Sequence, residues 1–340
     1  MIRETSVTQC VSPDRSPHTL VAELCGAWFG PHLSAEACAR GSRPIPAAWP
    51  SQVRVESVFE HAVNVRVVPE ECGRESEAGD ALLLSLVTRR SAMSVRALLL
   101  ERIPGGLRRG MQVALGENRL RLSPVRVEVV FGTSPVYEGR IEAAEAPAGL
   151  AEELRAAVVR HGRPGGLLGL IDPRRRNAYS IYAERRLERT REDSAHLLGL
   201  GGGLTPSGDD FILGVLAAEA LFPREPPEPR EPPELQEGHR PAGRHALARR
   251  VERRLVHDAA TTEVSRTMLR LACAGRFPYY LQQFAERLRS ALVETAPLDS
   301  GARPARDAAV TAAVQDAVIH GGTSGTDALV GFVRCLFDKR

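Results

Sequence analysis

The period of the hydrophobic pattern changes once along this 340-residue chain, and that change restricts the fold more than any other feature. From Ser51 to about Tyr137, short Val-rich segments alternate or run apolar between Gly, Pro and Asn residues. After about Pro147 the apolar residues recur at helical spacing. We therefore predict an α+β protein with a β-rich, barrel- or sandwich-like domain over residues 51–147 and a mostly helical domain over residues 148–340.

Five segments of the first half predict strands: QVRVESVF, AVNVRVV, ALLLSLV, MQVAL and VRVEVVF. Strands this close together, with no helix between them, favour an antiparallel barrel or sandwich. Residues 1–50 lack this pattern. We expect them to form an irregular N-terminal segment with one short helix from His18 to Phe29.

The second half predicts a series of helices, several of which end at a Gly or before a Pro. They cover residues 149–162, one or two stretches within 178–200, FILGVLAAEALF, 244–260, 262–274, 278–293, 307–319 and a last helix that begins near Asp327. An insert over residues 223–243 contains the imperfect repeat REPPEP and REPPEL. Such a Pro/Glu/Arg-rich stretch cannot bury apolar surface, so we expect a disordered surface loop.

Composition excludes several classes of protein. A net charge of +3, with the basic residues spread along the chain, argues against nucleic-acid binding. The six cysteines stand singly, without zinc-ligand spacing. The stretch MIRETSVTQC lacks the apolar run of a signal peptide, and no apolar segment is long enough for a bilayer. We expect a cytoplasmic protein with no membrane partner.

A glycine loop, GLGGGLTPSGDD at Gly199–Asp210, is the first candidate site. Glycines allow positive φ and let the backbone approach a ligand closely. Thr205-Pro206 and Ser207 predict a helix start, where free N–H groups and the positive dipole end attract anions. The loop has no Walker A lysine and no preceding strand, which excludes the better-known phosphate-binding loops.

The two carboxylates of this loop allow more than one interpretation. Ser207-x-x-Asp210 has the spacing of a capping box, which is the favoured interpretation of Asp210 taken alone. Asp209 is harder to explain as a cap. Two adjacent carboxylates beside an anion site would suit a catalytic base or Mg²⁺ ligands, so Asp209 and Asp210 are candidate catalytic and metal-binding residues.

A second loop, GGTSGTDALVG at Gly321–Gly331, repeats the pattern. Ser324-Gly325-x-Asp327-x-x-x-Gly331 matches Ser207-Gly208-x-Asp210-x-x-x-Gly214. Glycine inside a helix costs roughly 1 kcal/mol relative to Ala, so close packing is the expected reason for the last glycine of each motif. We predict that the two helices pack with their N-termini converging on one pocket.

Two further features have both a structural and a functional interpretation. In HDAATTEVSRTML, the residues Thr261, Thr262 and Ser265 lie near a helix start, where capping is favoured over a pocket role. His320 precedes the second loop and would serve as an acid/base group, or simply interact favourably with the end of a helix.

The segments GLGGGLTPSGDDFILG, TTEVSRTML and GGTSGTDALVG, in that order, resemble the AllH-like family, long catalogued as a domain of unknown function. The resemblance covers the chain from about Ser51, with its specific part C-terminal. That family includes a subunit of oxamate carbamoyltransferase from allantoin catabolism. The resemblance implies a multi-subunit complex with an acyl-CoA-synthetase-like chain and a further subunit, in which oxamate and carbamoyl phosphate interconvert with oxalurate and phosphate.

The resemblance implies that the pocket binds a small anionic substrate, either carbamoyl phosphate or oxamate. It does not imply a particular cofactor, and Mg²⁺ is the candidate metal. The residues expected to bind substrate are Gly201, Gly202, Gly203, Thr205, Ser207, Gly208, Thr262, Thr323, Ser324, Gly325 and Asp327. Two alternatives stay open: a Mg²⁺-dependent enzyme acting on another phosphorylated small molecule, and a non-catalytic assembly subunit whose glycines serve helix packing. Homo-oligomerisation is compatible with each.

Overall fold

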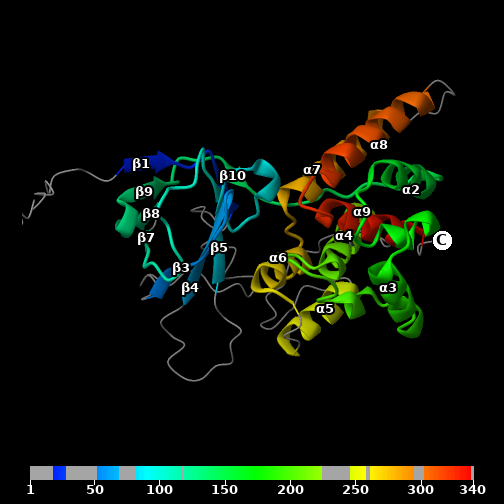
Figure 1. The fold of residues 1–340 in the computed structure, drawn as a ribbon. Coiled ribbons are helices and arrows are strands. Elements are labelled where there is room, and N and C mark those ends of the chain that lie inside the picture. The colour runs from blue at the N-terminus through cyan, green and yellow to red at the C-terminus, as the bar shows by residue number, and fades with distance from the viewer. Residues whose placement is uncertain are drawn as a thin grey trace, which may run out of the picture.

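A computed structural model describes residues 18–27, 52–68, 82–116, 118–223, 246–257, 261–294 and 302–337. Its strands lie in the N-terminal half of the chain and its helices in the C-terminal half, and the two parts stand side by side (Figure 1). The predicted α+β class is therefore confirmed.

The strands form two sheets. The first has the order β1-β9-β8-β7 and the second the order β10-β2-β6-β5-β4-β3. Their bounds are β1 His18–Val21, β2 Leu24–Gly26, β3 Gln52–Val58, β4 Ala62–Val68, β5 Leu82–Val87, β6 Ala97–Leu99, β7 Ala114–Gly116, β8 Arg119–Leu122, β9 Val127–Val130 and β10 Val136–Tyr137.

The two sheets share one apolar core, as in a sandwich. Strand β4 shows how the sequence produces it, because successive side chains point to opposite faces. Val63, Val65 and Val67 are buried in the core that also contains residues of β8 and β9. The alternate residues Asn64 and Arg66 lie on the other face, where Asn64 contacts Ser85 of β5 and Arg66 contacts Glu263 of α6.

Two expectations for the sheets are wrong. Within the expected helix of residues 18–29, the described part, 18–27, forms mainly strands instead, because His18–Val21 pairs with β9 and Leu24–Gly26 lies between β6 and β10. The sheets are also not purely antiparallel, since β1 pairs with β9, β2 with β10 and β5 with β6 in parallel. Alternation of apolar residues identifies a strand, but it does not select the direction of its partner.

The helices follow the predicted order. Their bounds are α2 Leu150–His161, α3 Ala178–Arg189, α4 Ser207–Leu221, α5 Ala246–His257, α6 Glu263–Cys273, α7 Tyr279–Glu294, α8 Ala302–Val318 and α9 Ser324–Phe337. Both α8 and α9 begin a few residues earlier than expected. Nearly all of the Pro-rich insert, from residue 224 onward, falls outside the described residues, so its predicted disorder stays a prediction.

Helix α4 forms the centre of the helical part, with α9 beside it (Figure 1). Every residue of α4 from 208 to 218 is buried, which explains why its sequence is apolar on all sides rather than along one stripe. None of the described helices combines the length and apolar character that a membrane crossing requires.

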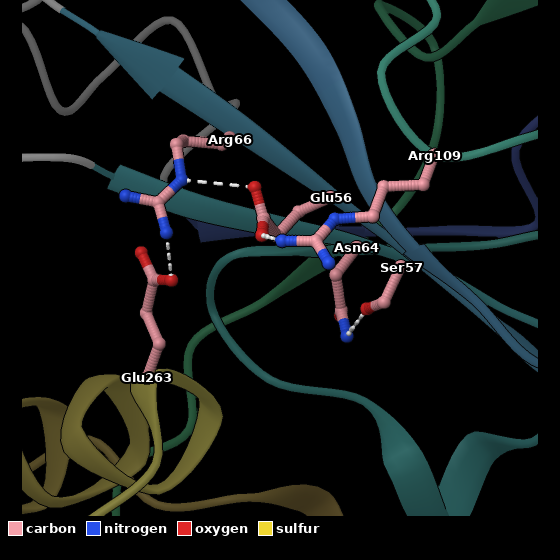
Figure 2. A network of polar contacts seen from close by, with 6 residues as sticks. All are labelled: Glu56, Ser57, Asn64, Arg66, Arg109 and Glu263. Atoms are coloured by element: carbon pink, nitrogen blue, oxygen red, sulfur yellow. Dashed lines mark hydrogen bonds and ion pairs between the residues drawn. The ribbon is translucent and has the colours of Figure 1, made fainter.

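Helices α6 and α7 join the helical part to the six-stranded sheet. The backbone N–H of Tyr279 donates to the carbonyl of Met93 at 2.9 Å, and that of Phe277 donates to Gly139 at 2.7 Å. Figure 2 shows a further polar contact between the two parts, in which Arg66 of β4 pairs with Glu56 of β3 at 3.1 Å and with Glu263 at the start of α6. The N-terminus of α6 is thus held against the sheet.

Candidate functional site

Helices α4 and α9 cross at two glycines. A Cβ placed on Gly214 would lie 1.7 Å from the carbonyl oxygen of Ala328, and one placed on Gly331 would lie 2.0 Å from that of Phe211. No side chain fits at such distances, so the backbones are in direct contact. The expectation that these glycines serve close packing is confirmed.

The crossing brings the two helix N-termini together. The hydroxyl oxygens of Thr205 and Ser324 lie 2.9 Å apart, although one precedes α4 and the other begins α9. Each helix also places its serine near the other's carboxylate: the Ser324 hydroxyl lowers the pKa of Asp210, and the Ser207 hydroxyl lowers that of Asp327. The two helix N-termini thus converge, as predicted, in an approximately two-fold arrangement, whereas their forming a ligand pocket stays a prediction.

The glycine loops that precede the two helices contain several exposed glycines. Gly201 and Gly203 have φ values of 118° and 90°, which only glycine adopts without strain. Within the described part of the chain, no atom lies within 4 Å of a Cβ built on Gly202, on Gly203 or on Gly322. These exposed positions are where a ligand would reach the helix N-termini.

Gly208 and Gly325 occupy a different environment. A Cβ on either would lie 2.0 Å from a backbone oxygen, that of Leu197 or that of Ala317. Their N–H groups donate inside the protein, to Leu200 at 2.8 Å and to His320 at 3.0 Å. Both glycines are therefore needed for packing of the first helical turn, and part of each N-terminus is satisfied by its own loop.

The capping-box interpretation of Asp210 is wrong. The residue before α4 is Pro206, and within the described residues no side chain caps this helix. Ser207 and Asp210 have the spacing of a capping box, but the Asp210 side chain turns toward Ser324 of α9 instead of its own backbone. For α6, by contrast, the cap is confirmed, because the Thr262 hydroxyl accepts a 3.1 Å hydrogen bond from the backbone N–H of Ser265.

Asp209 is fully buried and occupied by protein donors. One oxygen accepts from the N–H of Gly199 at 2.7 Å, and the other accepts from the Ser265 hydroxyl at 2.6 Å and from the Thr261 hydroxyl. Burial raises its pKa, and these donors act against that rise. The carboxylate ties the start of the glycine loop to α6, and Thr262 adds a hydrogen bond to the carbonyl of Leu204.

Asp327 has one strong backbone partner. Its Oδ1 accepts from the N–H of Leu167 at 2.5 Å, whereas its Oδ2 is buried without a hydrogen-bond partner among the described residues. A Cβ on Gly166 would lie 2.2 Å from the same carboxylate, so only glycine fits there. Burial raises the pKa of Asp327, and the hydrogen bond from Leu167 opposes the rise.

Asp210 has no such partner. Its side chain is 1% exposed, and neither carboxylate oxygen has a hydrogen-bond partner within the described residues. Burial raises its pKa well above the ordinary value, and the charges of Asp327 and Asp209 add to this. The hydroxyls of Ser324 and Thr205 lie near the carboxylate and oppose the rise.

Tyr280 completes the cluster, and the sequence analysis missed it. Its hydroxyl is buried without a hydrogen-bond partner in the described part of the protein, and its pKa is raised well above the ordinary value by burial and by the charges of Asp210 and Asp327. Its ring stacks on His320 with centroids 4.0 Å apart. Burial lowers the pKa of His320 to about 4, so the imidazole is neutral at physiological pH. Nothing in the doublet Tyr279-Tyr280 indicates which ring turns inward.

The predicted metal ligands, Asp209 and Asp210, do not point toward a common position as the ligands of a metal ion do. Asp209 and Asp210 face different partners, and among the described residues no three His, Cys, Asp or Glu side chains are arranged to hold a metal ion. Two carboxylates with nearby hydroxyls, as at Asp210 and Asp327, are the nearest approach to one.

A cavity of about 230 Å³ elsewhere in the helical part is a rival location for a ligand. It is lined by residues of α4, α5 and α9, including Glu219, Arg250 and Arg334. Its arginines already have acidic partners, because Arg250 pairs with Asp193 at 2.9 Å and Arg334 with Glu192 at 2.7 Å. This cavity is therefore less suited to an anion than the helix N-termini are.

Residues 197–336 match the model of a family described as oxamate carbamoyltransferase subunit AllH. The matched stretch contains both glycine loops, α4, α6 and α9, and it ends before the last residue of α9. The matched stretch does not include the strands. The weaker similarity that we expect from about Ser51 onward is therefore not part of the match. Comparisons with curated proteins and with solved structures find no match.

Proposed function

We propose that this chain, whose residues 197–336 belong to the AllH family, is a subunit of a carbamoyltransferase complex that binds a small anionic substrate where α4 and α9 meet. The observation that carries the proposal is the 2.9 Å approach of Thr205 and Ser324, which aligns two helix N-termini beside exposed glycines. Two dipole ends at one point attract an anion without any lysine.

The proposed reaction joins oxamate and carbamoyl phosphate to give oxalurate and phosphate, or runs in reverse. The amide nitrogen of oxamate forms a bond to the carbamoyl carbon, the bond from that carbon to the phosphate oxygen breaks, and the nitrogen loses a proton. The site would contribute orientation and stabilisation of the charge on the departing phosphate. No covalent enzyme intermediate is needed.

Asp210 is the better candidate for the base. A base needs a free oxygen, and both oxygens of Asp210 lack hydrogen-bond partners within the described residues, whereas those of Asp209 are occupied. Burial raises the pKa of Asp210, which makes the ionised carboxylate a stronger proton acceptor. In this proposal Asp209 positions the glycine loop instead, and Thr205, Ser207, Thr323 and Ser324 supply hydroxyls.

The proposal also includes the assembly that the family name implies. The description of the family as a subunit supports partner chains. An acyl-CoA-synthetase-like chain and a further subunit are the proposed companions, in a cytoplasmic complex. Carbamoyl phosphate or oxamate is the proposed small-molecule partner.

A thermal-shift series on the full-length chain tests the proposed binding. Carbamoyl phosphate, phosphate, oxamate, ADP, ATP and CoA would each be added with and without Mg²⁺. A ligand at about one hundred times its dissociation constant adds roughly 2.7 kcal/mol of stability. We expect a shift with carbamoyl phosphate or oxamate that is lost in the Ser207→Ala, Ser324→Ala double variant and retained in Ser123→Ala, which changes an exposed serine of the β-rich part. An equal shift in the double variant would contradict the proposal.

The same series tests the first alternative, and an activity measurement tests the second. A shift with another phosphorylated ligand only when Mg²⁺ is present would support a Mg²⁺-dependent enzyme. The contacts of Gly214 and Gly331 favour the assembly subunit as the second candidate, because they explain those glycines by packing alone. Full activity of a reconstituted complex that contains Asp210→Ala would support that candidate.

A further inference from the structure

The two-fold arrangement of α4 and α9 is broken at its carboxylates. Asp210 and Asp327 occupy equivalent positions in their motifs. Asp327 accepts a backbone hydrogen bond from Leu167, delivered by the segment that follows α2. No described segment delivers an equivalent donor to Asp210, whose two oxygens have no hydrogen-bond partner there. A buried carboxylate without donors is costly, so this asymmetry needs an explanation.

Within the described residues, no positive charge acts on Asp210 to balance it. The groups that act on it within the described residues are the hydroxyls of Ser324 and Thr205, the carboxylates of Asp327 and Asp209, and the buried phenol of Tyr280. All of these are acids or hydroxyls. Within the described residues, no N–H group donates a hydrogen bond to Asp210.

We infer that the unpartnered oxygens of Asp210 accept the N–H groups of a substrate NH₂, and that Asp210 therefore selects an amide or carbamoyl group over an oxygen or methyl group of the same shape. The inference rests on the proposed function and assigns one role within that site. A primary amide offers two N–H donors to a carboxylate, which are the donors that the cluster lacks.

Other occupants fit this position less well. A phosphate or carboxylate oxygen placed against Asp210 brings no N–H donor, and it meets a like charge whenever the Asp210 carboxylate is ionised. A metal ion would find the carboxylates of Asp210 and Asp327, but among the described residues no three acidic, His or Cys side chains are arranged to hold one. The anionic end of the substrate would instead face the exposed glycine loops, at the open side of the helix N-termini.

Three small ligands of nearly the same shape isolate the NH₂ group. Oxamate carries it, oxalate has an oxygen in its place, and pyruvate has a methyl group. Calorimetric titration of the full-length chain in EDTA would measure the three dissociation constants, and a repeat with Mg²⁺ would show any role of the metal. We expect oxamate to bind at least about tenfold more tightly than either analogue, because a site built for N–H donors leaves its acceptor unpaired with the others.

Two matched variants test which carboxylate is responsible. Asp210→Asn replaces one acceptor oxygen by a donor, and we expect it to lose the preference for oxamate. Asp327→Asn keeps an oxygen for Leu167, and we expect it to keep the ratio between the ligands whatever its absolute affinity. Thermal melts of both variants would confirm that they are folded.

The outcomes separate this inference from the proposed function. Equal binding of the three ligands by the wild-type chain would overturn the role of Asp210 and leave the pocket intact. A preference that survives in Asp210→Asn, or that appears only with Mg²⁺, would also overturn it. Failure of the wild-type chain to bind any of these ligands or carbamoyl phosphate would overturn both.

Discussion

Gly214 of α4 lies directly against the carbonyl oxygen of Ala328 of α9, so closely that a Cβ on the glycine would be 1.7 Å from that oxygen. The equivalent contact joins Gly331 to Phe211. Because the two helices meet so near their first turns, their N-terminal loops are forced together. The packing of two glycines thus creates the geometry of the candidate site.

Replacing either glycine by alanine should separate the helices. We expect Gly214→Ala and Gly331→Ala each to reduce the free energy of unfolding by about 1–3 kcal/mol, the cost of overpacking a core, because backbone atoms must move. Urea denaturation measures the change. Gly105→Ala is the control, since no described atom lies within 4 Å of its Cβ, and equal stability of all three variants would contradict the close contact.

Replacing the exposed glycines of the loops, Gly202 and Gly322, should leave the stability of the protein almost unchanged. Gly202→Ala and Gly322→Ala place a methyl group where the described part of the chain leaves space. We therefore expect their free energies of unfolding to lie within about 0.5 kcal/mol of the wild-type value. If a ligand lies there, its affinity should fall at least several-fold. Thermal melts with and without oxamate measure both quantities. Unchanged affinity in both variants would show that the loops do not contact the ligand.

Loss of the Asp209 carboxylate should loosen the glycine loop. Asp209→Ala leaves the Gly199 N–H and the Ser265 hydroxyl without their acceptor, which costs about 1–3 kcal/mol for each donor left buried. Urea denaturation should report this loss. Asp307→Ala on the exposed face of α8 serves as the control. A stability equal to that of the control would show that Asp209 is not the anchor.

Asp210 should make stability depend on pH in a direction that follows from its burial. Its folded-state pKa lies above the unfolded value of about 3.9, so the folded protein holds this proton more tightly. Its contribution to stability is greatest below the unfolded pKa and falls as the pH rises toward the folded pKa. Asp210→Asn avoids that loss, and we expect it to be more stable than wild type at pH 7–8 by on the order of 1 kcal/mol.

The advantage of Asp210→Asn should shrink as the pH approaches 4. Thermal melts of both proteins between pH 4 and 8 measure it. An advantage that is constant with pH, or that grows toward acid, would mean that Asp210 is not the buried, unpartnered carboxylate described above.

Much of this arrangement could be predicted from the sequence because it depends on local patterns. The shared spacing of Ser207–Gly214 and Ser324–Gly331 indicated two similar helix starts, and the final glycines indicated close packing. The helix boundaries followed from periodicity and from Gly and Pro breaks.

The rest depends on contacts between distant segments. Ser207-x-x-Asp210 has the spacing of a cap, and only the presence of α9 shows that Asp210 turns away from its own backbone. The N–H of Leu167 and the hydroxyl of Tyr280 reach the cluster from segments without a distinguishing motif. Similarly, β1 could not be recognised before its parallel partner β9 was placed.

A crystal structure of the chain with bound oxamate would locate the ligand relative to the two helix N-termini. We predict oxamate at the N-termini of α4 and α9, with its carboxylate toward the glycine loops and its NH₂ group within hydrogen-bond distance of Asp210. Oxamate bound elsewhere, for example in the cavity beside Arg250 and Arg334, would contradict the account.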